Sequence, residues 1–94
     1  MAAPEARRYM RNPAISETAV DDELFLVEPE SQEVFYLDTV SSGLWRLLAE
    51  PQTTDTVVSL FAAAFPDTVR ADIERDVAAA LAEMKRRGLV VMVS

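Results

Sequence analysis

The spacing of hydrophobic and polar residues changes near residue 38. Residues 34–37, Val-Phe-Tyr-Leu, are typical of a short strand, and polar residues follow immediately. The next apolar positions, Leu44, Leu47 and Leu48, have the spacing of one helix face, so the period changes from about 2 to about 3.6 within a few residues. The pattern predicts a β-rich first part, a helical second part, and a strand at residues 34–37 that joins them.

Two more stretches before this junction have strand character. Residues 23–28 contain four consecutive apolar residues and are followed by the turn-forming residues 29–32, so they predict a hairpin with the strand that ends at Leu37. Residues 13–20 alternate loosely and end at Asp21-Asp22, which predicts a further strand and a turn. Both hairpin strands are apolar on both faces. One face is expected to cover the helices, and the other needs the N-terminal segment, a second protomer or a bound peptide to cover it.

Three helices and a final strand are expected after the hairpin. The pattern places the helices at about residues 38–49, 54–65 and 67–88, and a strand at 89–93. Asp38, Thr39 and Ser41 can each cap the first helix, Thr53 or Thr54 can cap the second, and Gly88 suits a left-handed C-cap. This order predicts an α+β winged helix-turn-helix, in which an N-terminal antiparallel β-hairpin or three-stranded sheet precedes three α-helices. Residues 1–12 lack periodicity and are expected to be a flexible tail, leaving residues 13–94 as the domain.

The composition argues against catalysis and against a membrane protein. The chain has no Cys and no His, which removes thiol nucleophiles, the usual general base and the common transition-metal ligands. We therefore expect no enzyme activity, no metal site and no cofactor. The sequence has neither an apolar run long enough to span a bilayer nor a signal peptide. A cytoplasmic location is expected, with which the lack of Cys is compatible.

The charge distribution argues against nucleic acid as a partner. The net charge is −7, and residues 13–38 contain eight carboxylates without any Lys or Arg. The predicted second helix also lacks basic residues, although a winged helix that binds DNA carries such side chains into the major groove. The fold is thus expected without the DNA-binding function.

The strand at residues 34–37 is a candidate peptide-binding edge. If it lies at the edge of its sheet, its backbone can pair with an extended peptide, and a helix alongside can supply the second wall of a groove. Two flanks of the third helix offer small residues between charged ones. One flank has Asp76, Ala80, Glu83 and Arg87, and the other has Glu74, Ala78 and Lys85.

The order of motifs resembles the PqqD-like family of peptide chaperones, which includes the recognition elements for ribosomally made precursor peptides. The resemblance covers roughly residues 14–92 and is most specific in Val-Phe-Tyr-Leu-Asp at 34–38, Gly-Leu-Trp-Arg-Leu-Leu at 43–48 and Gly-Leu-Val at 88–90. Two features differ from residues that are common in the family: Asp38 and the turn at residues 50–52. The difference in the turn leaves the subfamily open.

The resemblance implies a non-catalytic protein that binds the leader segment of a precursor peptide as an added strand. It would present that leader to a modifying enzyme such as a radical SAM protein, a cyclase or a protease. The first flank of the third helix is preferred as the wall of the groove. The implied peptide-binding residues are Val34, Phe35, Tyr36, Leu37, Asp76, Ala80, Glu83 and Arg87.

Two other functions are compatible with the predicted fold. The doubly apolar hairpin would also suit a homodimer or a structural subunit of a larger biosynthetic enzyme. A winged-helix transcription regulator would need a basic face, which the sequence lacks.

Overall fold

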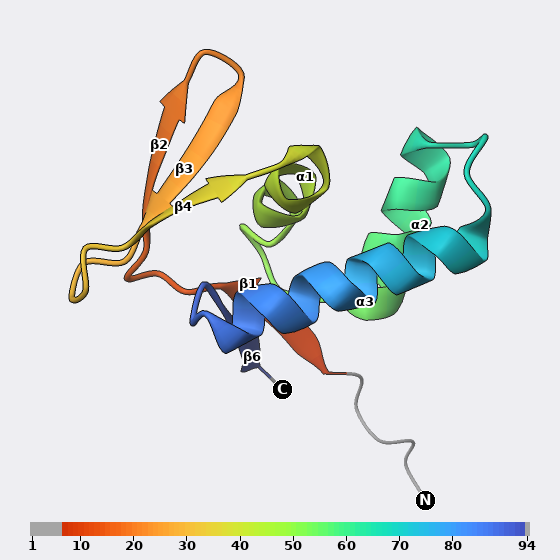
Figure 1. Ribbon diagram of the computed structural model, residues 1–94. Coiled ribbons are helices and arrows are strands. Elements are labelled where there is room, and N and C mark those ends of the chain that lie inside the picture. Colours follow the sequence, from red (N-terminus) through yellow and green to blue (C-terminus); the bar gives the residue numbers. More distant parts are fainter. Residues whose placement is uncertain (1–6, 94) are drawn as a thin grey trace, which may run out of the picture.

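A computed structural model describes residues 7–93, which form two small antiparallel sheets and three helices (Figure 1). The elements are β1 (Arg8–Arg11), β2 (Ser16–Val20), β3 (Glu23–Val27), β4 (Val34–Leu37), α1 (Thr39–Leu47), β5 (Gln52–Thr53), α2 (Thr54–Ala64), α3 (Arg70–Arg86) and β6 (Val90–Val93). The predicted α+β fold, with an N-terminal antiparallel sheet ahead of three helices, is confirmed.

One sheet has the strand order β2-β3-β4 and contains the predicted hairpin. Its register places Phe25 opposite both Thr18 and Tyr36. The β2–β3 turn contains Asp21 at φ 56°, and the β3–β4 turn contains Gln32 at φ 59°. Both turns therefore use a left-handed residue to reverse the chain within a few positions. In Figure 1 the β2–β3 hairpin projects away from α2 and α3.

The second sheet, of order β5-β1-β6, corrects the expectation of a tail through residue 12. Residues 8–11 form its central strand, β1, and residues 1–6 lie outside the described part of the chain. Asn12 extends the connection, because its amide donates to the Leu89 carbonyl at 3.0 Å and its side chain donates to the Gly88 carbonyl at 2.9 Å. The partners of β1 are distant in the sequence, and its residues, Arg-Tyr-Met-Arg, do not form an apolar strand pattern, so the sequence gives little sign of it.

The helix boundaries follow local capping. The carboxylate of Asp38 accepts a hydrogen bond from the Ser41 amide at 2.8 Å, and the Thr53 hydroxyl accepts one from the Thr56 amide at 3.1 Å, as expected for N-caps. The third helix starts at Arg70, later than predicted, because residues 65–68 form a turn in which the Thr68 amide donates to the Phe65 carbonyl at 3.1 Å. After α3, Gly88 has φ 74°, the left-handed conformation that ends the helix.

The hydrophobic core joins the β2-β3-β4 sheet to the inner faces of the helices. Trp45 of α1 is the largest of its fully buried side chains and is 1% exposed. Its indole Nε1 donates to Glu17 of β2 at 2.8 Å, and its carbonyl accepts from Nε of Arg11 at 2.7 Å. Trp45 thus connects α1 with β2 and with the end of β1. Within residues 7–93, none of the helices is long and apolar enough to cross a bilayer.

Candidate functional site

The edge of β4 leaves backbone groups open for pairing. Among residues 7–93, β4 pairs with β3 alone, so its other edge has no strand beside it. The Glu28 amide donates to the Glu33 carbonyl at 2.9 Å, which marks these two residues as a hydrogen-bonded pair. Because such pairs alternate along an antiparallel ladder, the N–H and C=O groups of Val34 and Tyr36 point away from β3. These two residues provide the open hydrogen-bonding positions of β4.

The side chains of β4 alternate between the core and solvent. Leu37 is buried and Phe35 is partly buried, and both lie on the inner face of the sheet. Val34 and Tyr36 are 61% and 57% exposed on the outer face. The inner side chains therefore hold the strand in position while its outer side chains and open edge remain accessible.

The third helix forms a second wall opposite β4. Two adjoining cavities, which share Ser41, Glu83 and Met84, form one groove between β4 and α3. The guanidinium of Arg87 lies over the ring of Phe35, with its central carbon 5.3 Å from the ring centroid. This contact brings the C-terminal end of α3 to the side of β4. We refer to the two adjoining cavities together as the β4–α3 groove.

Glu83 and its arginine neighbours give this wall of the groove its polar character. The Glu83 carboxylate accepts from Nε of Arg87 at 2.5 Å and also bonds the Arg86 guanidinium. The hydrogen bonds from Arg86 and then Arg87 lower the pKa of Glu83 below its usual range, so the carboxylate stays ionised near neutral pH. Among the described residues, no cluster of three or more acidic residues has the geometry of a metal site.

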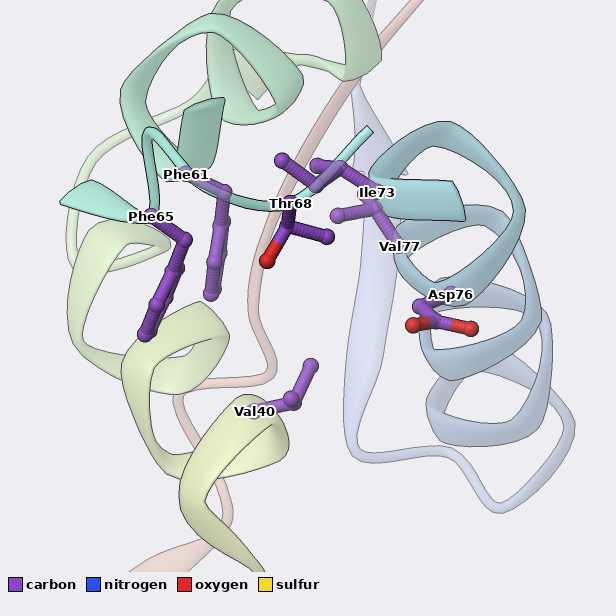
Figure 2. Close-up of a pocket in the computed structure, with 7 residues that line it drawn as sticks. All are labelled: Val40, Phe61, Phe65, Thr68, Ile73, Asp76 and Val77. Carbon is purple, nitrogen blue, oxygen red and sulfur yellow. The ribbon is translucent and has the colours of Figure 1, made fainter. Parts of the chain in front are cut away.

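An apolar pocket continues the groove toward the N-terminal end of α3. It shares Val40 and Asp76 with the groove and has a volume of about 150 Å³. Figure 2 shows the rings of Phe61 and Phe65 along one wall, with side chains of α3 opposite them and Val40 between the two walls. An apolar cavity of this size can accommodate a benzene-sized group. We call this cavity the helical pocket; its lining residues are Val40, Phe61, Phe65, Thr68, Ile73, Asp76 and Val77.

The structure brings together the eight residues that the sequence pointed to. The β4–α3 groove is lined by Val34, Phe35, Tyr36, Leu37, Asp76, Ala80, Glu83 and Arg87. The alternative flank lies elsewhere, since Nζ of Lys85 approaches the sulfur of Met92 in β6 at 3.8 Å. The assignment of the eight groove residues to peptide binding remains a prediction.

Sequence reasoning did not identify several other residues that line the groove and the helical pocket. Ser41, Met84 and Leu89 line the groove, and Val40, Phe61 and Phe65 line the pocket. Phe61 and Phe65 are one helical turn apart, which was a local sign of a shared aromatic face. No local sign existed for the approach of α1 and α3 to that face.

The other open edge of the sheet lacks a comparable second wall. β2 is also an edge strand, and all five of its residues are exposed. The groove and the helical pocket involve residues of β4 and the helices, and none of β2. The β4 edge is therefore the better candidate for a site that must combine backbone pairing with side-chain contacts.

Comparisons with known proteins agree with this geometry. Residues 23–90 match the family described as coenzyme PQQ synthesis protein D (PqqD), which confirms the resemblance found in the sequence. No curated protein sequence gives a significant match.

Two solved structures are similar to most of the chain. One is TbiB1 in complex with the TbiA(beta) leader peptide, with 27% identity, a TM-score of 0.77, and coverage of 86% of this chain and 93% of that one. The other is a lasso peptide synthetase B1 complexed with the leader peptide, with 26% identity, a TM-score of 0.73, and coverage of 88% and 96%.

Proposed function

The chain belongs to the PqqD family, and from this premise we propose that it binds the leader segment of a ribosomally synthesised precursor peptide and presents it to a modifying enzyme. The observation that carries the proposal is the open edge of β4 facing α3 across a groove. Both similar structures are described as leader-peptide complexes, which supports the same function for this chain.

In the proposed complex, the leader adds a strand beside β4. Val34 and Tyr36 each offer one N–H and one C=O, so four backbone hydrogen bonds are available. At about 1 kcal/mol net for each bond, they would supply roughly 4 kcal/mol, which corresponds to millimolar affinity. Micromolar binding requires a similar contribution from side chains of the leader.

The helical pocket supplies a place for such a contribution. It lies beyond Asp38 and Ser41 at the end of the groove, and its walls are mostly apolar. An apolar side chain of the leader that leaves water for this pocket gains roughly 1.5–3 kcal/mol. The proposed recognition thus combines sequence-tolerant backbone pairing along β4 with selection for an apolar residue at a fixed distance from the paired segment.

We assign the chemical step to the partner enzyme. The chain has neither His nor Cys, and two charged groups of the groove, Glu83 and Arg87, are held in an ion pair on the helix surface. Its contribution would be to bind and orient the leader. A transcription regulator is not favoured, because α2 has no basic residue.

An amide NMR titration with the leader of a precursor encoded beside this chain's gene tests the proposal. Strand addition predicts shifts that concentrate at Val34–Leu37 and on the face of α3 that includes Ala80 and Glu83. An unchanged spectrum, or shifts confined to the β2 edge, would contradict the proposed function.

A further inference from the structure

The β2-β3-β4 sheet has a second face that the rest of the described chain leaves uncovered. Leu24 and Leu26 of β3 point into the core. The alternate residues of β3, and the residues of β2 and β4 that lie opposite them, therefore point to the other face of the sheet. We call this the outer sheet face; it consists of Ser16, Thr18, Val20, Glu23, Phe25, Val27, Val34 and Tyr36.

Most of the outer sheet face is apolar and accessible. Val20 is 52% exposed, in addition to the exposed Val34 and Tyr36. Phe25 packs against Tyr36 with ring centroids 5.5 Å apart, and this pair forms the centre of the face. An apolar surface that runs across three strands is typical of a contact with another protein.

Acidic residues lie at both ends of this face. Asp21, Asp22 and Glu23 are at the β2–β3 turn, and Glu28, Glu30 and Glu33 are at the β3–β4 turn. The Glu28 carboxylate accepts hydrogen bonds from the amides of Ser31 and Glu30, which lower its pKa and keep it ionised. Residues 13–38 contain no Lys or Arg to offset these charges. Within residues 13–38, the apolar centre is therefore bordered by negative charge alone.

We propose that the outer sheet face is the docking surface for the modifying enzyme, and that the enzyme meets it with an apolar patch bordered by Lys and Arg. Charge complementarity selects this occupant over a second copy of the chain, because two such faces placed together would bring acidic ends against acidic ends. The acidic borders steer a basic surface toward the sheet, and the Phe25–Tyr36 pair provides the aromatic anchor.

This inference goes beyond leader binding but connects to it, and the connection rests on the proposed function. A leader strand added beside β4 would continue the sheet and place every second leader side chain on the same face as Tyr36. The enzyme would then contact the chain and the bound leader at once. We expect it to bind the leader-loaded chain more tightly than the free chain.

The test measures two affinities separately. The probe is the purified modifying enzyme encoded beside this chain's gene, used with the intact chain, and a fluorescent leader peptide reports leader binding. The variant Thr18→Lys/Val20→Lys places two cations on the outer sheet face. Both positions lie on β2, an edge strand, and edge strands tolerate Lys. β3 separates β2 from β4, so the open edge of β4 is left unchanged. Leu60→Lys on α2, at a 45% exposed apolar residue away from the sheet, is the matched control.

The expected result is a loss of enzyme affinity of about tenfold or more for the double variant, with leader affinity unchanged and Leu60→Lys like the wild type. Added salt should weaken enzyme binding to the wild type. Unchanged enzyme affinity in a folded double variant overturns the docking proposal, as do a greater loss with Leu60→Lys and an absence of enzyme binding to the wild type. None of these results bears on leader binding, which fails only if the fluorescent leader does not bind.

Discussion

The Arg87 guanidinium lies over the Phe35 ring, with its central carbon 5.3 Å from the ring centroid, and thereby connects the two walls of the β4–α3 groove. Arg87 is also held by Glu83 from the preceding turn of α3. Phe35 is packed partly into the core. The groove is therefore shaped in the free protein by contacts on both walls, which reduces the ordering cost when a peptide binds.

Tyr36→Pro is expected to abolish leader binding while leaving the fold intact. It removes an N–H that points to the open edge, and proline is tolerated on edge strands. The matched control is Ala19→Pro. The ladder alternation directs the Ala19 amide to the open edge of β2, so this variant makes the same backbone change on the other edge. Fluorescence anisotropy with a labelled leader measures both variants.

Circular dichroism shows whether each proline variant is folded. Normal leader affinity in folded Tyr36→Pro, or an equal loss in Ala19→Pro, would mean that the β4 edge is not the pairing site.

Arg87→Ala is expected to weaken leader binding several-fold with a small effect on stability. The variant removes the cation–π contact with Phe35. A contact of this kind at a partly exposed site contributes about 0.5–1 kcal/mol to the interaction between the two side chains. Arg86→Ala is the control, because Arg86 also bonds Glu83 but does not line the groove. Isothermal titration calorimetry distinguishes them. Equal losses in both variants would assign the effect to the charge of the helix end and not to the groove.

The ionisation of Glu83 predicts how this helix end responds to acid. Hydrogen bonds from Arg86 and Arg87 lower its pKa in the folded protein below the usual 4.5. Its stabilising effect is therefore complete above pH 4.5 and is lost as the pH falls through the lower folded pKa. An NMR titration of the Glu83 carboxyl carbon should give a midpoint below 4.5, and the midpoint should rise in Arg86→Ala. An unchanged midpoint in that variant would contradict the assigned cause.

Trp45→Ala is expected to lower the free energy of unfolding by about 3–5 kcal/mol, because the indole is 1% exposed and is the largest fully buried side chain of the described residues. It also leaves Glu17 without the indole donor, although Arg11 remains 3.5 Å away. Leu60→Ala, at an exposed site on α2, should change stability by less than about 1 kcal/mol. Urea denaturation of both variants provides the measurement. Similar midpoints for the two would show that Trp45 does not support the core.

The sequence was sufficient for the elements whose signals are local. The change of period after Leu37 and the presence of Gly88 predicted the hairpin and the end of α3. The predicted cap candidates included Asp38 and Thr53, which begin α1 and α2 in the structure. The strand β1 escaped prediction because its partners, β5 and β6, come from far along the chain. The β4 strand and two candidate flanks of α3 could be read from the sequence, and the flank that lines the groove was chosen together with the family resemblance.

The helical pocket required three helices at once, and nothing local to Val40 or Phe65 indicated their approach. Phe65→Ala gives the corresponding test. Phe65 stacks on Phe61 with centroids 6.1 Å apart and forms one wall of the pocket, but it is 45% exposed, so its removal should cost little stability. If an apolar leader side chain occupies the pocket, leader affinity should fall by about tenfold or more.

Leu60→Ala is a close control for Phe65→Ala, because Leu60 lies on α2, of which Phe65 is the C-cap, has the same 45% exposure and does not line the helical pocket. A series of leader variants, each with one apolar residue changed to Ser, completes a set of double-mutant cycles with Phe65→Ala. One leader position should lose its effect on affinity in the Phe65→Ala background, since its pocket is already impaired. Additive losses at every leader position would place the apolar contact elsewhere in the groove.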